Sequence, residues 1–382
     1  MKIGIDARFF GLKHAGLGRY TQNLVLELEK IDRVNQYWIL FQKENLQQYS
    51  PVAPNFQKVA LSGHPYSALS QFVDWKVIRD LKLDLIHFTH FSHPVFYRGR
   101  FVVTIHDLIK NQFYGKGAST RSFMGYRLKH VGYKFVMNQA IERSTKIITP
   151  TNFVKDQILE NYPVDATKIV PIYEGADGRF KKAAYDSDER KKIWEKYEIA
   201  EPFLIYVGNV YPYKNVDKLL EAMKWIATNQ LDPEIQKLML YIACSRSVFY
   251  DRIEQKIKRE GLVGKVRMLG FVPDEELPYL YSGALSYITA SLSEGFGITG
   301  IEAMACGAPV LSSNRSCLPE VYGKAALYFD PENMSEISQR ILEVVRSSGL
   351  RKELKAKGEK QIKKYSWEKM ARETLQVYNS LS

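Results

Sequence analysis

The sequence predicts an α/β protein with two Rossmann-like domains, each built on a doubly wound parallel sheet. The chain has 382 residues, and a single hydrophobic core rarely grows beyond about 250–300 residues. Short apolar runs alternate with helical patterns in two successive stretches, which is typical of parallel sheets covered on both faces. Between the stretches, the segment 173–188 contains two glycines and mixed charge. We therefore expect the interdomain linker there.

The expected elements follow the chain in order. In the first stretch, we expect helices over 20–30 and 69–81, and the strands are 2–6, 37–41, 58–61, 84–88, 101–105 and 146–149. In the second stretch, we expect helices over 215–228, 248–260, 274–281 and 298–306, and the strands are 203–207, 237–243, 266–269, 284–288, 309–311 and 326–328. From Ser335 onward the pattern is helical almost to the end. Residues 1–175 are thus expected to form the first domain, and residues 180–365 the second.

Composition limits the cellular context. The cysteines Cys244, Cys306 and Cys317 include no Cys-x-x-Cys pair, so neither a disulfide framework nor a zinc site is expected. Residues 1–6 lack the apolar core of a signal peptide. The chain has no run of about 18 apolar residues. We expect a cytoplasmic protein with reduced thiols.

The positive charge is unevenly distributed. The net charge is +12, and the segment 108–155 has nine Lys or Arg residues against the single acid Glu142. Within it, the segment 119–139 is basic and aromatic with helical periodicity. Such a helix lies either on an anionic membrane, here the inner face of the cell membrane, or on the protein with one solvated basic face. The sequence leaves both readings open.

The most informative stretch is 293–310, which follows a strand and enters a helix. Gly295, Phe296, Gly297 and Ile298 form the turn, and its glycines permit close approach of the backbone to a ligand. The start of the helix offers unpaired N–H groups and a partial positive charge, which suit a diphosphate. Glu294 and Glu302 bracket the turn. Their carboxylates are suited to accept hydrogen bonds from sugar hydroxyls.

A second group of residues follows the strand 203–207. Gly208 and Asn209 begin the loop, and Lys214 ends it. A lysine at this position is suited to neutralise a departing diphosphate. Arg246, which follows another strand, is a candidate second cation.

The stretch 293–310 resembles the Glu-x7-Glu motif of the retaining glycosyltransferases of family 4, which have the GT-B fold. Supporting segments are 206–215, 270–273, 149–153 and 15–20. The resemblance covers nearly the whole chain. It implies that Glu294 lies beside the transferred sugar and that Glu302 holds the ribose hydroxyls.

The resemblance extends to further residues. It implies that His106 contacts the donor sugar, and that the terminal helix 367–378 packs on the first domain, so that residues 366–382 belong with it. Phe271 falls in the matching segment 270–273 and is expected at the donor site. The loop with Gly16 and Gly18 is expected to lie over a phosphate or a sugar.

Two positions depart from the family pattern. Asn209 stands where an arginine often follows the glycine, and Ala15 stands where the family often has the first of two glycines.

Other candidates are weaker. His87, His90 and His93 lie at the end of one strand, near Pro94 and several phenylalanines. This favours a loop that lines the acceptor side at best, and not a metal site. The chain lacks an Asp-x-Asp motif flanked by strand signals. No obligatory metal is therefore expected.

Together with these residues, the resemblance implies a retaining hexosyltransferase (EC 2.4.1-type). It would transfer a sugar from a nucleotide-sugar, with GDP-mannose favoured and a UDP-sugar possible, to a glycan or polyprenyl-linked acceptor in polysaccharide biosynthesis. One alternative is a GT-B-fold nucleotide-sugar epimerase. The other is a non-enzymatic basic protein that binds membrane or RNA, although the usual RNA-binding motifs are missing.

Overall fold

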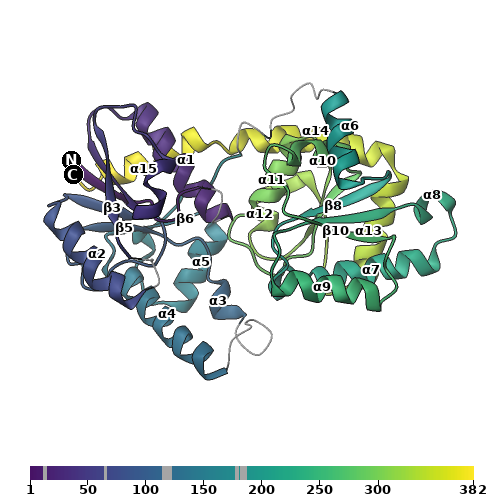
Figure 1. Ribbon diagram of the computed structural model, residues 1–382, viewed down its shortest axis with the longest axis horizontal. Coiled ribbons are helices and arrows are strands. Elements are labelled where there is room, and N and C mark those ends of the chain that lie inside the picture. Colours follow the sequence, from purple (N-terminus) through teal and green to yellow (C-terminus); the bar gives the residue numbers. More distant parts are fainter. Residues whose placement is uncertain (12–14, 64–66, 114–122, 177–179, 181–186) are drawn as a thin grey trace. The chain divides into compact units, whose positions relative to one another are not determined.

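The computed structural model describes the chain except residues 12–14, 64–66, 114–122, 177–179 and 181–186 (Figure 1). It also leaves out the side chains of residues 15, 68–72, 123–129 and 187. The chain forms two compact units. The first comprises Met1–Gln112, Arg121–Gly175 and Tyr365–Ser382, and the second comprises Phe113–Thr120 and Ala176–Lys364.

The first unit contains a seven-stranded sheet in the order β3-β2-β1-β4-β5-β6-β7, and every recorded pairing is parallel. The chain winds outward in both directions from β1 and β4, so these two strands flank the point where the strand order reverses. The strands are β1 (Lys2–Asp6), β2 (Gln36–Gln42), β3 (Phe56–Leu61), β4 (Leu85–Phe88), β5 (Phe101–Thr104), β6 (Lys146–Thr149) and β7 (Ile169–Pro171). The helices are α1 (Ala15–Ile31), η2 (Lys43–Gln48), α2 (Ala68–Asp80), α3 (Ile109–Gln112), α4 (Phe123–Arg143), α5 (Asn152–Asn161), η3 (Ala166–Lys168) and α15 (Trp367–Asn379).

The second unit contains a six-stranded parallel sheet in the order β10-β9-β8-β11-β12-β13. Its order reverses between β8 and β11. The strands are β8 (Phe203–Val207), β9 (Met239–Ala243), β10 (Val266–Gly270), β11 (Ser286–Thr289), β12 (Val310–Ser313) and β13 (Ala326–Phe329). The helices are α6 (Ser187–Tyr197), η5 (Pro212–Lys214), α7 (Val216–Asn229), α8 (Pro233–Gln236), α9 (Val248–Arg259), α10 (Leu277–Gly283), α11 (Ile298–Ala305), α12 (Leu318–Tyr322), η6 (Gly323–Ala325), α13 (Met334–Arg346), α14 (Ser348–Gln361) and η7 (Ile362–Lys364).

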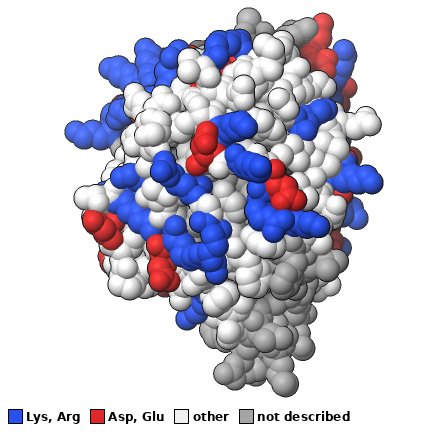
Figure 2. Space-filling view, turned by 90° about the vertical axis from the view of Figure 1, so that its left-hand side faces the viewer, with Lys and Arg blue, Asp and Glu red and all other residues white. Residues whose placement is uncertain are grey.

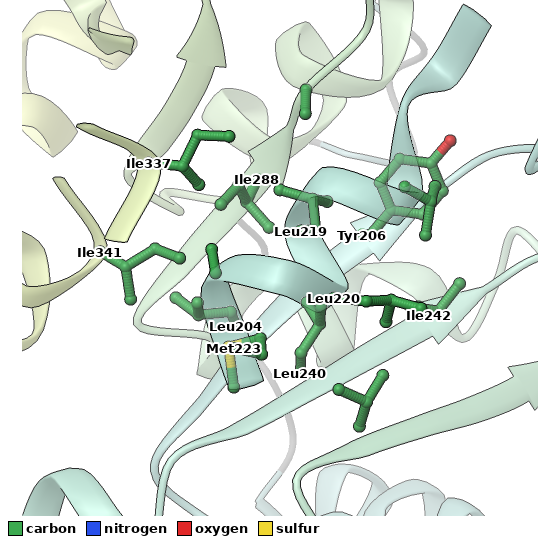
Figure 3. Close-up of a cluster of buried hydrophobic side chains, with 14 of the residues drawn as sticks. Leu204, Tyr206, Leu219, Leu220, Met223, Leu240, Ile242, Ile288, Ile337 and Ile341 are labelled. Atoms are coloured by element: carbon green, nitrogen blue, oxygen red, sulfur yellow. The ribbon is translucent and has the colours of Figure 1, made fainter. Parts of the chain in front are cut away.

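The core of the second unit explains how α7 is held on the sheet. Leu219, Leu220 and Met223 recur at helical spacing on one face of α7, and all are buried. They point toward Leu204 of β8 and Leu240 of β9 (Figure 3). Truncating one such leucine to alanine costs about 2–5 kcal/mol, because the cavity cannot fully collapse. The loop after β8 is thus anchored by a well-packed helix.

The fold class predicted from the sequence is confirmed, and the differences are local. The short strand β7 was not predicted, because three residues that end in a proline carry little periodic signal. Helix α10 begins at Leu277 and not at the predicted residue 274, with Pro278 in its first turn, where a missing N–H costs nothing. The terminal helix α15 packs on α1 within the first unit.

Candidate active site

The turn between β11 and α11 is organised by Gly297. This residue is the N-cap of α11 and has φ 79° and ψ 43°, a left-handed conformation that strongly favours glycine. A Cβ at this position would lie 2.6 Å from Leu318 Cδ2 and 2.7 Å from the Tyr322 hydroxyl oxygen. The turn therefore requires glycine for its backbone conformation and also for its packing.

Tyr322 of α12 packs against the start of α11. Its hydroxyl donates to the Gly297 carbonyl at 2.6 Å, and a Cβ on Gly300 would lie 2.3 Å from the same hydroxyl oxygen. The phenol thus fixes the first turn of α11. The Gly300 N–H of that turn donates to the Gly297 carbonyl, whereas the N–H groups of Ile298 and Thr299 stand at the helix start, where the helix itself supplies no acceptor.

Lys214 and Glu294 meet at the carboxyl ends of β8 and β11. Lys214 Nζ donates to Glu294 Oε1 at 2.5 Å, and the two side chains are 16% and 14% exposed. Ser291 Oγ donates to the same carboxylate oxygen at 2.7 Å. The lysine predicted to face a diphosphate and the glutamate predicted to face a sugar are therefore direct partners.

Backbone contacts position both members of this pair. The Leu292 N–H donates to the Tyr213 carbonyl at 2.8 Å, which joins the loop before α7 to the loop after β11. Asn215 caps α7 in the left-handed conformation, with φ 55°, and its Nδ2 donates to the Pro331 carbonyl. The Glu294 N–H donates to Ser316 Oγ. Both loops are thus held from several directions.

The phenol of Tyr287, near the Lys214–Glu294 pair, stays protonated. Burial, with a smaller contribution from the negative charge of Glu294, raises the pKa of Tyr287 to about 12. Its hydroxyl lies 2.7 Å from Thr299 Oγ1 on the first turn of α11. This hydroxyl therefore remains a hydrogen-bonding group, and it carries no negative charge near an anionic ligand.

Glu302 lies one turn into α11 and is fully buried. Its predicted contact with ribose hydroxyls would require the groups that cover it to move. Phe296, in the turn itself, is also buried. Glu302 is therefore close in the chain to Glu294, but its side chain is not exposed beside the Lys214–Glu294 pair.

The remaining predicted donor residues lie on loops at the carboxyl ends of β8, β9 and β10. Gly208 has φ 139°, and its N–H donates to the Ala243 carbonyl. Asn209 is exposed and accepts a hydrogen bond from Tyr206 through its carbonyl. Arg246 and Phe271 are also exposed. No recorded contact joins these side chains to the Lys214–Glu294 pair among the described residues.

In the first unit, His106 follows β5 as expected. Its Nε2 lies 2.9 Å from the Thr89 carbonyl oxygen, and its Nδ1 lies 3.3 Å from Glu174 Oε1. The edge of Tyr20 packs on its ring, with centroids 4.7 Å apart. The imidazole is thus oriented on both edges by the protein.

Gly16 and Gly18 both lie on the first turns of α1, and the structure gives them different surroundings. A Cβ on Gly18 would lie 1.9 Å from the Gly11 carbonyl oxygen, whereas a Cβ on Gly16 would meet nothing within 4 Å. Gly18 is therefore required for the packing of the loop after β1. No such packing requirement is recorded for Gly16 among the described residues.

The interpretation of all three neighbouring histidines as acceptor-side lining is wrong for two of them. His87 is fully buried in β4, with Nδ1 2.6 Å from the Tyr378 hydroxyl and Nε2 2.8 Å from Thr104 Oγ1. His93 is also buried, and its ring stacks on Phe101. Only His90 is partly exposed.

Comparisons with known proteins identify the family of the chain. Residues 14–179 match the model of the family described as Glycosyltransferase Family 4, and residues 187–361 match the model described as Glycosyl transferases group 1. The chain belongs to the group 1 glycosyltransferases of family 4. No helix among its described residues is both long enough and apolar enough to cross a bilayer.

Among relatives of this glycosyltransferase, O-antigen chain mannosyltransferase B of Escherichia coli is 32% identical over 64% of the chain and 63% of its own length. An O-antigen chain mannosyltransferase of Salmonella typhimurium is 28% identical over 65% of the chain and 61% of its own length. The chain thus spans less than two thirds of these relatives. An uncharacterized glycosyltransferase of Methanocaldococcus jannaschii is 25% identical over 96% of the chain and 95% of its own length.

Solved structures share the fold of the glycosyltransferase. Sucrose-phosphate synthase from Thermosynechococcus elongatus superposes with a TM-score of 0.77 at 18% identity, covering 100% of this chain and 99% of that one. An Anabaena protein in complex with UDP-glucose superposes with a TM-score of 0.73 at 16% identity and covers 100% of both chains. The architecture is therefore GT-B.

Sequence reasoning missed several residues of the glycosyltransferase that shape the site. Ser291, Ser316 and Tyr322 contact the Glu294 turn, and Glu174 contacts His106. Ser291 lies three residues before Glu294, so its contact with Glu294 could have been predicted from the local sequence. The others come from distant segments, and no spacing in the chain indicates them.

Proposed function

We propose that this protein is a retaining hexosyltransferase that transfers a sugar, with mannose the best candidate, from a nucleotide-sugar to a glycan or lipid-linked acceptor. The Lys214–Glu294 pair beside the first turn of α11 is the observation that carries the proposal. It sets one cation and a row of helix N–H groups where a diphosphate would lie, and one carboxylate where a sugar would lie. The mannosyltransferase relatives support mannose, and with it GDP-mannose as the donor.

The donor diphosphate would compete with Glu294 for Lys214. In the free protein the ammonium group is neutralised by the carboxylate. When a diphosphate binds, Lys214 would turn toward the phosphate oxygens, which leaves Glu294 and Ser291 to accept and donate hydrogen bonds at the sugar. The binding free energy of the diphosphate would therefore rearrange the site for the sugar.

The chemistry would be a front-face displacement. The acceptor hydroxyl attacks the anomeric carbon from the side of the departing diphosphate, the C–O bond to the diphosphate breaks, and a phosphate oxygen takes the proton. Lys214 and the start of α11 would stabilise the charge that grows on the leaving group. The protein would also position the two substrates.

The decisive test is incubation of the purified protein with GDP-, UDP- and ADP-sugars, with and without polyprenyl-linked glycan acceptors. We expect transfer from a GDP-sugar, with GDP-mannose the best donor, and NMR of the product should show the anomeric configuration of the donor. An inverted product would refute retention. Conversion of the donor alone into its epimer would favour the epimerase alternative.

Association with a membrane is a second part of the proposal. Val131 and Phe135, which are 64% and 55% exposed, lie one turn apart on α4 beside exposed Lys134. Lys and Arg side chains also clearly outnumber Asp and Glu on one face of the molecule (Figure 2). Apolar side chains flanked by cations suit an interface with anionic lipid.

Vesicle co-sedimentation tests this part. Wild-type protein should sediment with vesicles that contain anionic lipid and should stay in solution with zwitterionic vesicles. Replacing both Val131 and Phe135 with serine should weaken sedimentation. The matched control is Val263→Ser, which removes another strongly exposed valine from the second unit. Equal sedimentation of the double variant and the control would contradict membrane docking through α4.

A further inference from the structure

A surface pocket lies on the second unit, between α7, α13 and the start of α14. Its volume is about 640 Å³, within the range of about 300–1,000 Å³ that is typical of small-molecule sites. All of its lining residues belong to the second unit. The side chains that give the pocket its chemistry are Trp225, Gln339, Leu342, Glu343, Arg346 and Leu350.

The pocket is separate from the candidate active site. The loops that hold Lys214 and Glu294 contribute no described residue to its lining. Trp225 lies nine residues after Val216, the first residue of α7, which is about 14 Å along the helix axis at about 1.5 Å per residue. A ligand in the pocket would therefore leave the Lys214–Glu294 pair uncovered.

The floor of the pocket is apolar and belongs to the hydrophobic core. Leu342 is buried in the core of the second unit, and Trp225 and Leu350 pack against that core while they stay partly exposed. Ile337 and Ile341 of α13 lie in the same core (Figure 3). Because a close-packed core holds its side chains in fixed positions, the exposed part of the indole ring is held in place.

The rim of the pocket is polar, and its side chains hold one another. Gln339 Nε2 donates to Glu343 Oε1 at 3.2 Å, and Arg340 Nη1 donates to Glu343 Oε2 at 2.9 Å. Arg346 Nη2 donates to Gln230 Oε1 at 2.8 Å. A guanidinium carries five N–H donors, and an amide or carboxylate oxygen has two lone pairs. The rim therefore has further capacity both to donate and to accept hydrogen bonds.

This combination suits an oligosaccharide. A hexose has a face of C–H bonds that packs on an aromatic ring, and its hydroxyls both donate and accept hydrogen bonds. Trp225 supplies the ring, and the rim supplies partners of both kinds. An anionic ligand would meet the carboxylate of Glu343, and a cationic ligand would meet the guanidinium of Arg346. A neutral polyhydroxyl ligand avoids both conflicts.

We propose that this pocket is an accessory site for an oligosaccharide, the growing glycan acceptor. The inference rests on the proposed function, in which the acceptor is a glycan. A second contact with the protein raises the effective concentration of the acceptor. A long acceptor is then bound more tightly than a short one, while the groups that take part in transfer stay the same.

Calorimetric titration of α-linked mannotetraose into the full chain tests the site without reference to transfer. Trp225→Leu, which keeps the floor apolar but removes the ring, should bind the probe about tenfold more weakly than the wild type. Arg346→Ala, at the exposed rim, should bind it about three- to tenfold more weakly. The matched control is Trp194→Leu, which replaces another partly exposed tryptophan of the second unit and should bind as the wild type does.

Two results of the titration would overturn the proposal. One is a wild type that does not bind the probe. The other is equal affinity of the wild type and the folded Arg346→Ala protein, which decides the question even if Trp225→Leu does not fold.

Kinetics test the role of the site in transfer. In Trp225→Leu and Arg346→Ala, KM for a tetrasaccharide acceptor should rise by the same factors, whereas kcat and KM for a prenyl-linked monosaccharide acceptor should match the wild type. Equal KM for the tetrasaccharide in the wild type and both variants would overturn the accessory role and leave the proposed function intact. A wild type that transfers no sugar would refute the proposed function, and the titration would still decide whether the pocket binds an oligosaccharide.

Discussion

Lys214 Nζ and Glu294 Oε1 lie 2.5 Å apart at the carboxyl ends of β8 and β11. The two residues are 80 positions apart in the chain, and sequence reasoning assigned them separate roles at a diphosphate and at a sugar. Because their side chains are paired, the predicted diphosphate contact and the predicted sugar contact fall at the same place in the second unit. In the free protein each charged group is neutralised by the other, and under the proposed function a bound donor would replace this contact.

Replacing Lys214 with methionine should lower turnover strongly. The variant removes the cation proposed to face the leaving group, and it leaves Glu294 without its partner. A preorganised electrostatic contact of this kind contributes about 10²–10³-fold to kcat. Initial rates with a saturating donor measure the effect. Lys214→Arg, which keeps the charge, should retain more activity than the methionine variant, and the reverse order would contradict the assigned role.

Gly297→Ala should destabilise the second unit more than Gly307→Ala does. Both glycines have positive φ, 79° and 73°, so each alanine carries a backbone cost of about 1–2 kcal/mol. A Cβ at Gly297 would also meet Leu318 and Tyr322, whereas one at Gly307 meets nothing within 4 Å. The matched pair separates conformational strain from packing. Urea unfolding of both variants measures the difference, and equal losses would show that Tyr322 does not constrain the turn.

Tyr378→Phe should loosen the docking of α15. The phenol hydroxyl lies 2.6 Å from His87 Nδ1 in the fully buried centre of the first unit. Without it, the ring nitrogen loses its partner, which costs about 1–3 kcal/mol. Hydrogen exchange of α15 and the free energy of unfolding report the change. A variant as stable as the wild type would mean that apolar packing alone holds the helix.

His87 should make stability depend on pH below about 6.5. Burial, and the charge of His106 to a lesser degree, lowers the pKa of His87 to about 3. Between these two pH values, His87 is protonated in the unfolded chain but neutral in the folded protein. The free energy of unfolding therefore falls as the pH falls. One such group contributes a slope of about 1.4 kcal/mol per pH unit.

His87→Gln checks this expectation. The slope of its stability between about pH 4 and pH 6 should be shallower than that of the wild type by the contribution of one proton. Parallel slopes for the two proteins, or an NMR signal that shows His87 charged at mildly acidic pH, would contradict the lowered pKa.

The sequence predicted most of the fold because the fold depends on local patterns. Runs such as 2–6, 146–149 and 203–207 have apolar centres, as buried parallel strands require, and they have the same bounds in the structure. β7 was missed because a three-residue strand that ends in a proline has almost no pattern of its own.

Residues of the candidate site could be predicted from the sequence only where they lie in one continuous segment. The turn from Glu294 to Ile298 follows from glycine spacing and the helix that comes after it. The contacts of Glu174 with His106 and of Tyr322 with Gly297 join residues 68 and 25 positions apart. Local patterns could not distinguish a ligand contact from core packing at Gly18 and His87, because the same residue types occur in both settings and only the neighbours in space separate them.

Calorimetric titration of a nucleoside diphosphate into wild-type and Lys214→Met protein tests the central claim most directly. The account predicts that the wild type binds GDP, and that the variant binds it at least about tenfold more weakly, a loss of about 1.4 kcal/mol, while remaining folded. Equal affinity of the two folded proteins, or no binding of any nucleoside diphosphate by the wild type, would contradict it.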